Sequence, residues 1–236
     1  GIALVTQSAM NALDPVYRVG AQIVEAIRTH EDCSKSAAWE RAAQLFESVG
    51  LKVEWIRRYP HEFSGGMRQR AIIAMALALN PPLIIADEPT TALDVIMQDQ
   101  VFAEVDRIRR DRGTALILIT HDISLVSENC DRIAIMYAGQ IAEMAPTRTI
   151  FDRAMHPYTI GLQNAFADLA DRGRDLISIA GAPPDLVHPP AGCRFAPRCP
   201  FVRGACREPP PLLERAKGHW VACHFAHEAE TFRLAG

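Results

Sequence analysis

The chain has 236 residues, enough for one sizeable domain and an appendage. Its formal net charge of -3 at pH 7 and its scattered basic residues give no support to a nucleic-acid partner. No apolar stretch approaches the roughly 18 residues that suggest a membrane span, and no signal peptide is visible, so we expect any work at a membrane to be done from its surface.

The first 62 residues are predicted to form one short strand followed by helices. Ile2–Val5 has the length and apolar character of a strand, and residues 8–15 read as a loop. Ser34 or Ser36 can cap the second of two helices, which Gly50 ends. The apolar positions expected to face a core are Val19, Ile23 and Ile27 in the first helix and Ala42, Leu45, Phe46 and Val49 in the second.

The next helix begins with a possible anion site. Ser64 reads as its N-cap, and Gly65 and Gly66 let a ligand approach the backbone closely. The free N–H groups of such a helix end suit a phosphate. Pro81 and Pro82 end the helix, whose predicted core face is Ile72, Met75, Ala76 and Leu79.

Two carboxylates follow a predicted buried strand. Leu83–Ala86 is a continuous apolar run, as expected of a parallel strand buried on both faces. Asp87 and Glu88 come directly after it. Ligands of open α/β sheets bind beyond the carboxyl ends of the strands, so we expect metal and water beside these two residues.

The following segment continues the alternation of helices and strands. Asp94 can cap a helix, Ala115–Ile119 reads as a strand, and Asp122 can begin another helix. Ile133–Glu143 reads as a hairpin that turns at Ala138-Gly139. This order predicts an α/β fold.

The tail combines one short helix with a Pro-rich segment that contains four cysteines. Pro157 suits the first turn of a helix that reaches about Leu169, and His156 is expected to cap or pack there more readily than to bind a ligand. The spacing of the cysteines is C-x5-C-x6-C-x16-C, and they are Cys193, Cys199, Cys206 and Cys223. The C-x2-C knuckles typical of zinc sites are absent, and four thiolates on irregular loops suit a [4Fe–4S] cluster. His219 and His224 keep a mixed-ligand Zn²⁺ site open as an alternative.

Five motifs together resemble those of ABC-type ATPases. Phe63–Gln69 resembles the signature motif, and Leu83–Glu88 resembles the Walker B strand. Leu93-Asp94 matches the D-loop, Thr120-His121-Asp122 the H-loop, and Thr6-Gln7 the Q-loop. A lone Ser-Gly-Gly carries little information, whereas five motifs in the family's order and spacing are specific.

The P-loop of that family is missing. It requires Gly-x4-Gly-Lys-Ser/Thr, but none of the lysines, Lys35, Lys52 and Lys217, follows a glycine. We therefore expect that the chain begins inside its ATPase domain and that this chain alone does not hydrolyse ATP. The alternative is a non-hydrolysing partner subunit that contributes only its signature face.

The resemblance implies in-line attack of water on the γ-phosphate of ATP bound with Mg²⁺. Glu88 is then expected to orient or deprotonate the water, and Asp87 to hold the Mg²⁺ shell. His121 is expected to contact the γ-phosphate, and Gln7 to sense metal and water.

The resemblance also implies that nucleotide sites form between two ATPase subunits. Ser64, Gly65, Gly66 and Gln69 would then close on the nucleotide of the second subunit, and Asp94 would lie at that interface. Residues from His156 to Leu162 resemble the start of the C-terminal extension of oligopeptide and dipeptide importer ATPases, relatives of which carry a [4Fe–4S] cluster.

The predicted fold is therefore an α/β, P-loop NTPase-like ABC ATPase domain without its N-terminal part. It spans residues 1–145, with a mostly helical subdomain and signature helix over 8–80, and an irregular extension follows over 146–236 with its cysteine segment at 193–223. The predicted role is the ATP-hydrolysing subunit of an importer of peptides or a related small solute. A soluble ABC ATPase of repair or translation is disfavoured by the tail.

The expected partners are a second ABC ATPase subunit, two transmembrane permease subunits and, indirectly, an extracytoplasmic solute-binding protein. The resemblance places the protein at the cytoplasmic face of the inner or plasma membrane as a peripheral subunit. The transported solute leaves no trace in this sequence.

Overall fold

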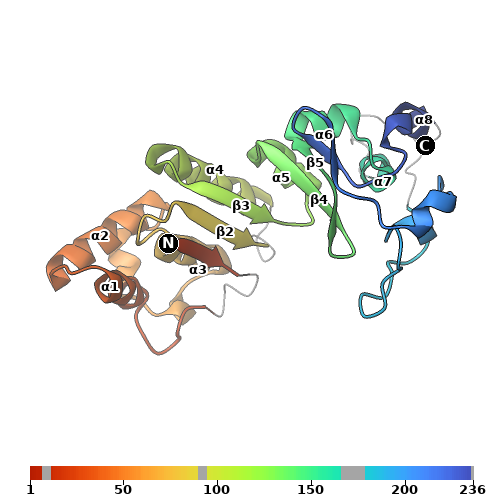
Figure 1. The fold of residues 1–236 in the computed structure, drawn as a ribbon. Coiled ribbons are helices and arrows are strands. Elements are labelled where there is room, and N and C mark those ends of the chain that lie inside the picture. The colour runs from red at the N-terminus through yellow and green to blue at the C-terminus, as the bar shows by residue number, and fades with distance from the viewer. Residues whose placement is uncertain (7–11, 90–94, 166–178, 235–236) are drawn as a thin grey trace. The chain divides into compact units, whose positions relative to one another are not determined.

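A computed structural model describes residues 1–6, 12–89, 95–165 and 179–234. The chain divides into two compact units, Gly1–Leu125 and Val126–Gly236 (Figure 1). The domain boundary expected after residue 145 rests on the family resemblance, whereas these two units are defined by compactness. The two criteria differ, so the expected boundary stays a prediction.

The first unit contains a parallel sheet with the strand order β1-β2-β3. These strands are β1 (Ile2–Val5), β2 (Leu83–Asp87) and β3 (Ala115–Ile119). The register aligns Leu4 with Ile85 and Ile85 with Ile117. Parallel strands joined through helices confirm the α/β class predicted for this part of the chain.

One face of this sheet is buried more completely than the other. Val5, Ile84 and Ala86 belong to the core, whereas Leu4 and Ile117 are exposed on the opposite face. The prediction that β2 is buried on both faces is therefore wrong for the described residues. Strand residues alternate between two faces, and the described helices that bury Ile84 and Ala86 pack on one of them.

Two helices form a layer beside the sheet, and their predicted core faces are confirmed. Val19, Ile23 and Ile27 are buried in α1, and Ala42, Leu45 and Phe46 in α2. The Ser34 side chain accepts a hydrogen bond from the Ala37 N–H, so Ser34 rather than Ser36 caps α2. The helical elements of this unit are α1 (Val19–His30), α2 (Lys35–Ser48), η2 (Val53–Arg57), η3 (Pro60–Glu62), α3 (Gly65–Ala76), α4 (Val95–Arg112) and α5 (Ile123–Asn129), the last of which continues into the second unit.

The signature helix α3 ends earlier than its apolar pattern predicted. Its last residue is Ala76, and Leu79, expected on the core face, lies beyond the helix and is 37% exposed. Asn80 then adopts a left-handed backbone with φ 45°, which asparagine tolerates better than most residues. The chain has therefore already turned before the two prolines that were expected to end the helix.

The second unit contains an antiparallel sheet with the strand order β4-β5-β7-β6. The predicted hairpin is confirmed: β4 and β5 pair, and the turn residues Ala138 and Gly139 have φ values of 47° and 80°, as in a type I′ turn. Glu143 in β5 aligns with Val221 in β7. The strands after α5 therefore pair with the tail instead of extending the parallel sheet. Their bounds are β4 (Arg132–Tyr137), β5 (Gln140–Pro146), β6 (Leu213–Ala216) and β7 (His219–Val221).

Short helices complete this unit. The described part of the helix predicted to begin at Pro157 is α7 (Pro157–Ala165), and its expected end near Leu169 lies outside the described residues. The other helical elements are α6 (Thr147–Arg153), η4 (Ala196–Arg198), η5 (Gly204–Arg207), η6 (Ala226–Glu228) and α8 (Ala229–Leu234). Within the described ranges, every helix is too short or too polar to cross a bilayer.

Candidate functional site

Glu88 stands at the carboxyl end of β2 on a strained backbone. Its N–H donates to the Ile119 carbonyl at 2.8 Å, which extends the pairing of β2 with β3 by one residue. Its φ of 44° is left-handed, a conformation that costs an L-residue other than glycine about 1–2 kcal/mol. Such strain is concentrated at functional positions. Asp87, the last residue of β2, lies on the same face of the strand as Ile85, the face opposite the core.

The structure brings Glu88 and His121, two of the predicted site residues, into contact. The Nδ1 atom of His121 lies 2.9 Å from Oε1 of Glu88. The imidazole is 77% exposed and the carboxylate 21%, so a ligand can reach both groups. Asp122 accepts hydrogen bonds from the N–H groups of Ser124 and Leu125 and thereby caps α5 directly behind the histidine. An imidazole and a carboxylate in contact can orient a water molecule and accept its proton.

The signature residues occupy the N-terminus of α3. The Ser64 hydroxyl accepts a hydrogen bond from the Met67 N–H at 3.3 Å, which confirms the predicted cap. Gly65 and Gly66 are the first two residues of the helix. Gln69 is only 5% exposed, and its side-chain nitrogen has no hydrogen-bond partner among the residues that the structure describes. Nucleotide contact by these residues stays a prediction, and Gln7 and Asp94 lie outside the described residues.

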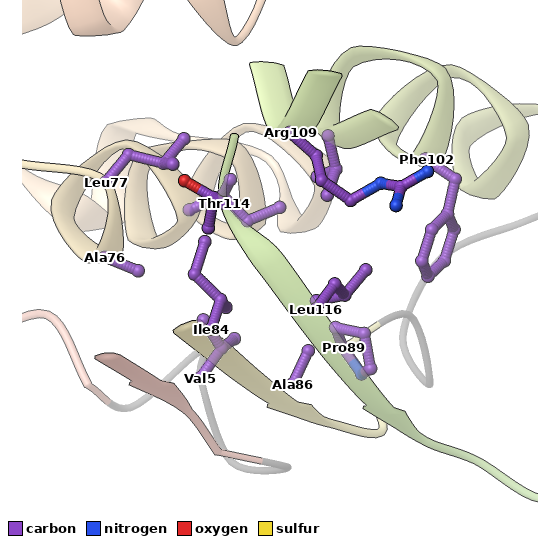
Figure 2. Close-up of a pocket in the computed structure, with 12 residues that line it drawn as sticks. Val5, Ala76, Leu77, Ile84, Ala86, Pro89, Phe102, Arg109, Thr114 and Leu116 are labelled. Atoms are coloured by element: carbon purple, nitrogen blue, oxygen red, sulfur yellow. The ribbon is translucent and has the colours of Figure 1, made fainter. Parts of the chain in front are cut away.

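A second feature of the first unit is an apolar cavity between the sheet and the helices α3 and α4. Figure 2 shows Val5, Ile84 and Ala86 of the strands on one side and Phe102 of α4 on another. Two polar side chains at its edge form hydrogen bonds within the protein. The Thr114 hydroxyl donates to the Pro81 carbonyl, and the Arg109 guanidinium donates to the Asp106 carboxylate. This cavity belongs to the core, and its described lining is mostly apolar.

The four tail cysteines line one cavity of the second unit. Cys193, Cys199, Cys206 and Cys223 are all free, half-buried thiols, and they share the cavity wall with four phenylalanines, Phe195, Phe201, Phe225 and Phe232. Two loops cross tightly beside it. The Cys193 N–H donates to the Cys206 carbonyl at 3.0 Å, and a Cβ on Gly192 would lie 2.4 Å from that same carbonyl oxygen, so only glycine fits there.

Burial opposes ionisation of the thiols in this cavity. Burial raises the pKa of Cys199 and of Cys223 to about 11, and it also raises the pKa of Cys193. The backbone N–H groups of Phe195, Phe201 and Phe225 act in the opposite direction and stabilise the thiolates. Each belongs to a residue two positions after its cysteine, so a repeated Cys-x-Phe pattern was a signal that the sequence analysis missed.

The histidines near the cavity have different surroundings. His224 lines it, and its Nε2 lies 3.0 Å from the Glu208 carbonyl. His219 instead lies 2.6 Å from a Glu143 carboxylate oxygen. Throughout the described ranges, no group of three or more His, Cys, Asp or Glu side chains is placed so that it could hold a metal ion.

His156 caps α7, as expected. Its Nδ1 accepts a hydrogen bond from the Tyr158 N–H at 3.0 Å. The side chain is buried, and this burial lowers its pKa to about 4. The neutral imidazole therefore works as a cap and a packing group. Glu143, which contacts the His156 backbone, is a buried polar residue that the sequence analysis did not single out.

Two family models match the chain. The model described as "ABC transporter" matches residues 1–91, and the model described as "Oligopeptide/dipeptide transporter, C-terminal region" matches residues 142–206. The first match includes the signature helix and Glu88. The second includes Glu143, His156 and three of the four cysteines.

Curated relatives match nearly the whole chain. The oligopeptide transport ATP-binding protein OppD of Salmonella typhimurium is 43% identical over 94% of this chain and 67% of its own length. OppD of Haemophilus influenzae is 40% identical over 99% of this chain and 72% of its own. A probable peptide ABC transporter ATP-binding protein of Sinorhizobium fredii, y4tR, is 46% identical over 96% and 69%. The chain thus spans about two thirds of the length of these relatives.

A solved structure supports the fold. The ATP-binding cassette MJ0796, solved as a dimer in a post-hydrolysis state with ADP and Pi, aligns with a TM-score of 0.56 and 28% sequence identity. The alignment covers 62% of this chain and 63% of MJ0796. The predicted nucleotide-binding fold is thereby confirmed.

Proposed function

Since the chain belongs to the ATP-binding proteins of ABC transporters, in the branch with the oligopeptide/dipeptide-type C-terminal region, we propose that it drives uptake of peptides or a related small solute by hydrolysing ATP. The observation that carries this proposal is the contact between Glu88 and His121 at the carboxyl end of the parallel sheet. Its relatives are named for oligopeptide or peptide transport, and small peptides are the first solutes to test.

The carboxylates at the strand end fit the chemistry of this reaction. Mg²⁺ prefers oxygen ligands, and Asp87 is the residue that would help to hold it. The ion supplies neutralisation of the phosphate charge when it is bound. Glu88, placed by the pairing of its own N–H with Ile119, orients the attacking water and accepts its proton. His121 approaches the γ-phosphate from the loop that follows β3, so two neighbouring strand ends position the reacting groups.

The signature residues serve a different part of the assembly. Ser64, Gly65 and Gly66 begin a separate helix whose N-terminal dipole favours anions. We assign them, with Gln69, to the nucleotide of a second ATPase subunit, and we assign Asp94 to the interface between the two subunits. Gln7 is assigned to the metal and water of the site that contains Asp87 and Glu88. The two subunits would act as peripheral partners of two permease subunits on the cytoplasmic face, and an extracytoplasmic binding protein would deliver the solute.

The test is Glu88→Gln in the assembled transporter. Turnover should fall by at least about 100-fold, since a positioned general base contributes 10²–10⁴-fold, whereas ATP binding should be retained. Glu25→Gln on the exposed side of α1 is the matched control and should leave turnover unchanged. Hydrolysis at the wild-type rate in the Glu88 variant would refute the assignment. Absence of hydrolysis from the wild-type assembly would favour the non-hydrolysing partner subunit.

The cysteine cavity supports a second, bound cofactor. We propose a [4Fe–4S] cluster held by Cys193, Cys199, Cys206 and Cys223. Four thiols on irregular loops surround one cavity with a phenylalanine wall, and backbone N–H groups favour three of the thiolates. Cysteine thiolates are the usual ligands of such a cluster, which supplies redox chemistry and cross-links the loops.

Iron and acid-labile sulfide analysis of anaerobically purified protein tests this assignment. Four irons and four sulfides per chain, with a broad visible absorption, are expected. Stoichiometric zinc without iron would replace the cluster by a zinc site, in which His224 is the available nitrogen ligand because it lines the cavity.

A further inference from the structure

A buried carboxylate in the second unit is not needed for ATP hydrolysis. Glu143 in β5 is 0% exposed. Its Oε1 accepts a hydrogen bond from the Met155 N–H at 2.6 Å and lies 2.6 Å from Nε2 of His219, and its Oε2 accepts one from the His156 N–H at 3.1 Å. A buried carboxylate is tolerated only when such partners satisfy it. Glu143 therefore ties together β5, the turn between α6 and α7, and β7.

The network continues from His156 to the peptide in front of a cysteine. Nδ1 of His156 accepts a hydrogen bond from the Tyr158 N–H, and the Ala222 backbone favours the protonated imidazole, which raises the pKa of His156 against the effect of burial. The Ala222 N–H donates to the Ala142 carbonyl at 2.8 Å. The Ala222 backbone thus bonds to Ala142, the neighbour of Glu143, and interacts electrostatically with His156, whose N–H Glu143 accepts. Ala222 directly precedes Cys223, so this peptide sets the direction from which that thiol enters the cavity.

His156 also contacts the opposite side of the cavity. Its ring centroid lies 5.9 Å from that of Phe195, and both residues line the cavity. Phe195 provides the N–H that stabilises the Cys193 thiolate. The His156 imidazole therefore lies beside residues that position both Cys193 and Cys223, which are 30 residues apart in the sequence.

The strand that carries His219 completes the frame. β7 ends at Val221, two residues before Cys223, and Val221 aligns with Glu143 itself. The contact between His219 and Glu143 fixes this short strand by a side chain in addition to its backbone pairing. The Arg215 guanidinium, from the other strand of the tail hairpin, donates to the Cys223 carbonyl at 3.1 Å.

We propose that Glu143 is a positioning residue for the cysteine site, acting through His156 and His219 to hold the thiols of Cys223 and Cys193 in a binding arrangement. The proposal rests on the metal-binding function proposed for this cavity. It adds that the site extends beyond its four sulfur ligands to a carboxylate in the sheet. Residues that orient metal ligands in this way commonly change metal affinity by 10–100-fold when they are replaced.

The test compares Glu143→Ala and Glu143→Gln with Glu230→Gln, an exposed glutamate of α8, as the matched control. Iron, sulfide and zinc per chain are measured at a temperature at which circular dichroism shows every variant to be folded. We expect metal retention against a chelator to fall about 10-fold or more in Glu143→Ala. Retention should fall less in Glu143→Gln, whose amide oxygen still accepts a backbone hydrogen bond, and should be unchanged in the control.

A second measurement does not depend on bound metal. In metal-free protein, the alkylation rate of Cys223 is compared by mass spectrometry with that of Cys33, which lies in the first unit. Positioning by Glu143 predicts faster alkylation of Cys223 in the Glu143 variants and an unchanged rate for Cys33. If wild-type protein binds neither iron nor zinc, the proposed cofactor is wrong, and the alkylation rates still decide the role of Glu143.

The proposal is overturned if a folded Glu143 variant keeps wild-type metal retention and wild-type Cys223 alkylation. A purely structural role predicts that combination together with a lower unfolding temperature. If Glu143→Ala does not fold, Glu143→Gln and His219→Gln carry the comparison, because each retains a hydrogen-bonding side chain at the same place.

Discussion

The two units each contain a glutamate in contact with a histidine, and the two pairs are built in opposite ways. In the first unit, Glu88 lies 2.9 Å from His121 at an open strand end, on a strained backbone. In the second unit, Glu143 lies 2.6 Å from His219 inside the protein, with 0% and 2% of their side-chain surfaces exposed. The first pair is accessible to a reactant, and the second is accessible to none.

This difference separates a pair that performs chemistry from a pair that holds a structure. A reacting carboxylate has to leave some of its hydrogen-bonding capacity to the substrate and water. Glu143 spends its capacity on two backbone N–H groups and an imidazole. The same two residue types therefore have different roles because of burial and hydrogen bonding alone, and replacing each glutamate should reveal the contrast.

The largest expected effect is on stability. Glu143→Ala leaves the His219 imidazole and two backbone N–H groups without their buried acceptor, so the free energy of unfolding of the second unit should fall by roughly 3–5 kcal/mol. Glu88→Ala removes a side chain from an open strand end. It should change the free energy of unfolding of the first unit by less than about 0.5 kcal/mol. Urea unfolding of both variants checks this. Equal losses would show that exposure does not distinguish the two pairs.

The next effect is the pH dependence of stability. Burial lowers the pKa of His156 to about 4 from its ordinary value of 6.5, so between these values the unfolded chain binds the extra proton. Stability should therefore be unaffected by this group above pH 6.5 and should fall by up to about 3 kcal/mol as the pH drops toward 4.

The variant His156→Asn isolates this contribution, because asparagine keeps a capping oxygen for the Tyr158 N–H but does not titrate. Unfolding free energies of metal-free protein between pH 4 and pH 7 are compared, so that loss of bound metal does not affect the slope. The variant should give the flatter profile. Parallel profiles would mean that the unfolded chain and the native protein bind this proton equally.

The first unit was the more predictable because its signals are local. The periodic apolar positions of α1 and α2, the cap at Ser34 and the carboxylates at the end of β2 all follow from residues within a few positions of one another. The contact between Glu88 and His121 was predictable because parallel strand ends meet at one edge of a sheet. Two local predictions failed: a turn at Asn80 ended α3 before its apolar pattern did, and β2 is fully buried on one face instead of two.

The second unit was predictable in its hairpin and in its cysteines, but not in its buried network. Glu143 finds one partner at His219, 76 residues away, and no periodic pattern signals that pairing. Its burial depends on β5 joining β7 across the whole tail. An acidic residue in a strand reads as an exposed position, and only the complete set of its hydrogen bonds makes burial favourable.

The smallest expected effect concerns backbone strain, which both units share. Ala138 at the hairpin turn has φ 47°, close to the 44° of Glu88. Ala138→Asn places Asn-Gly in a type I′ turn, the preferred pair there, and should stabilise the protein by about 1 kcal/mol. The hydrogen bond from Arg194 to the Ala138 carbonyl uses the backbone and is kept.

A matched change elsewhere in the hairpin shows whether conformation is the cause. Ala138→Gly should also stabilise the protein, whereas Ala134→Gly, at an exposed position within β4, should destabilise it by roughly 0.5–1 kcal/mol. Thermal unfolding of the three variants gives the signs. Glu88→Gly should relieve the same kind of strain and gain stability while turnover is lost, because only at Glu88 does the strained residue carry the reacting side chain. If Glu88→Gly loses stability instead, its left-handed backbone is held by contacts of the carboxylate itself.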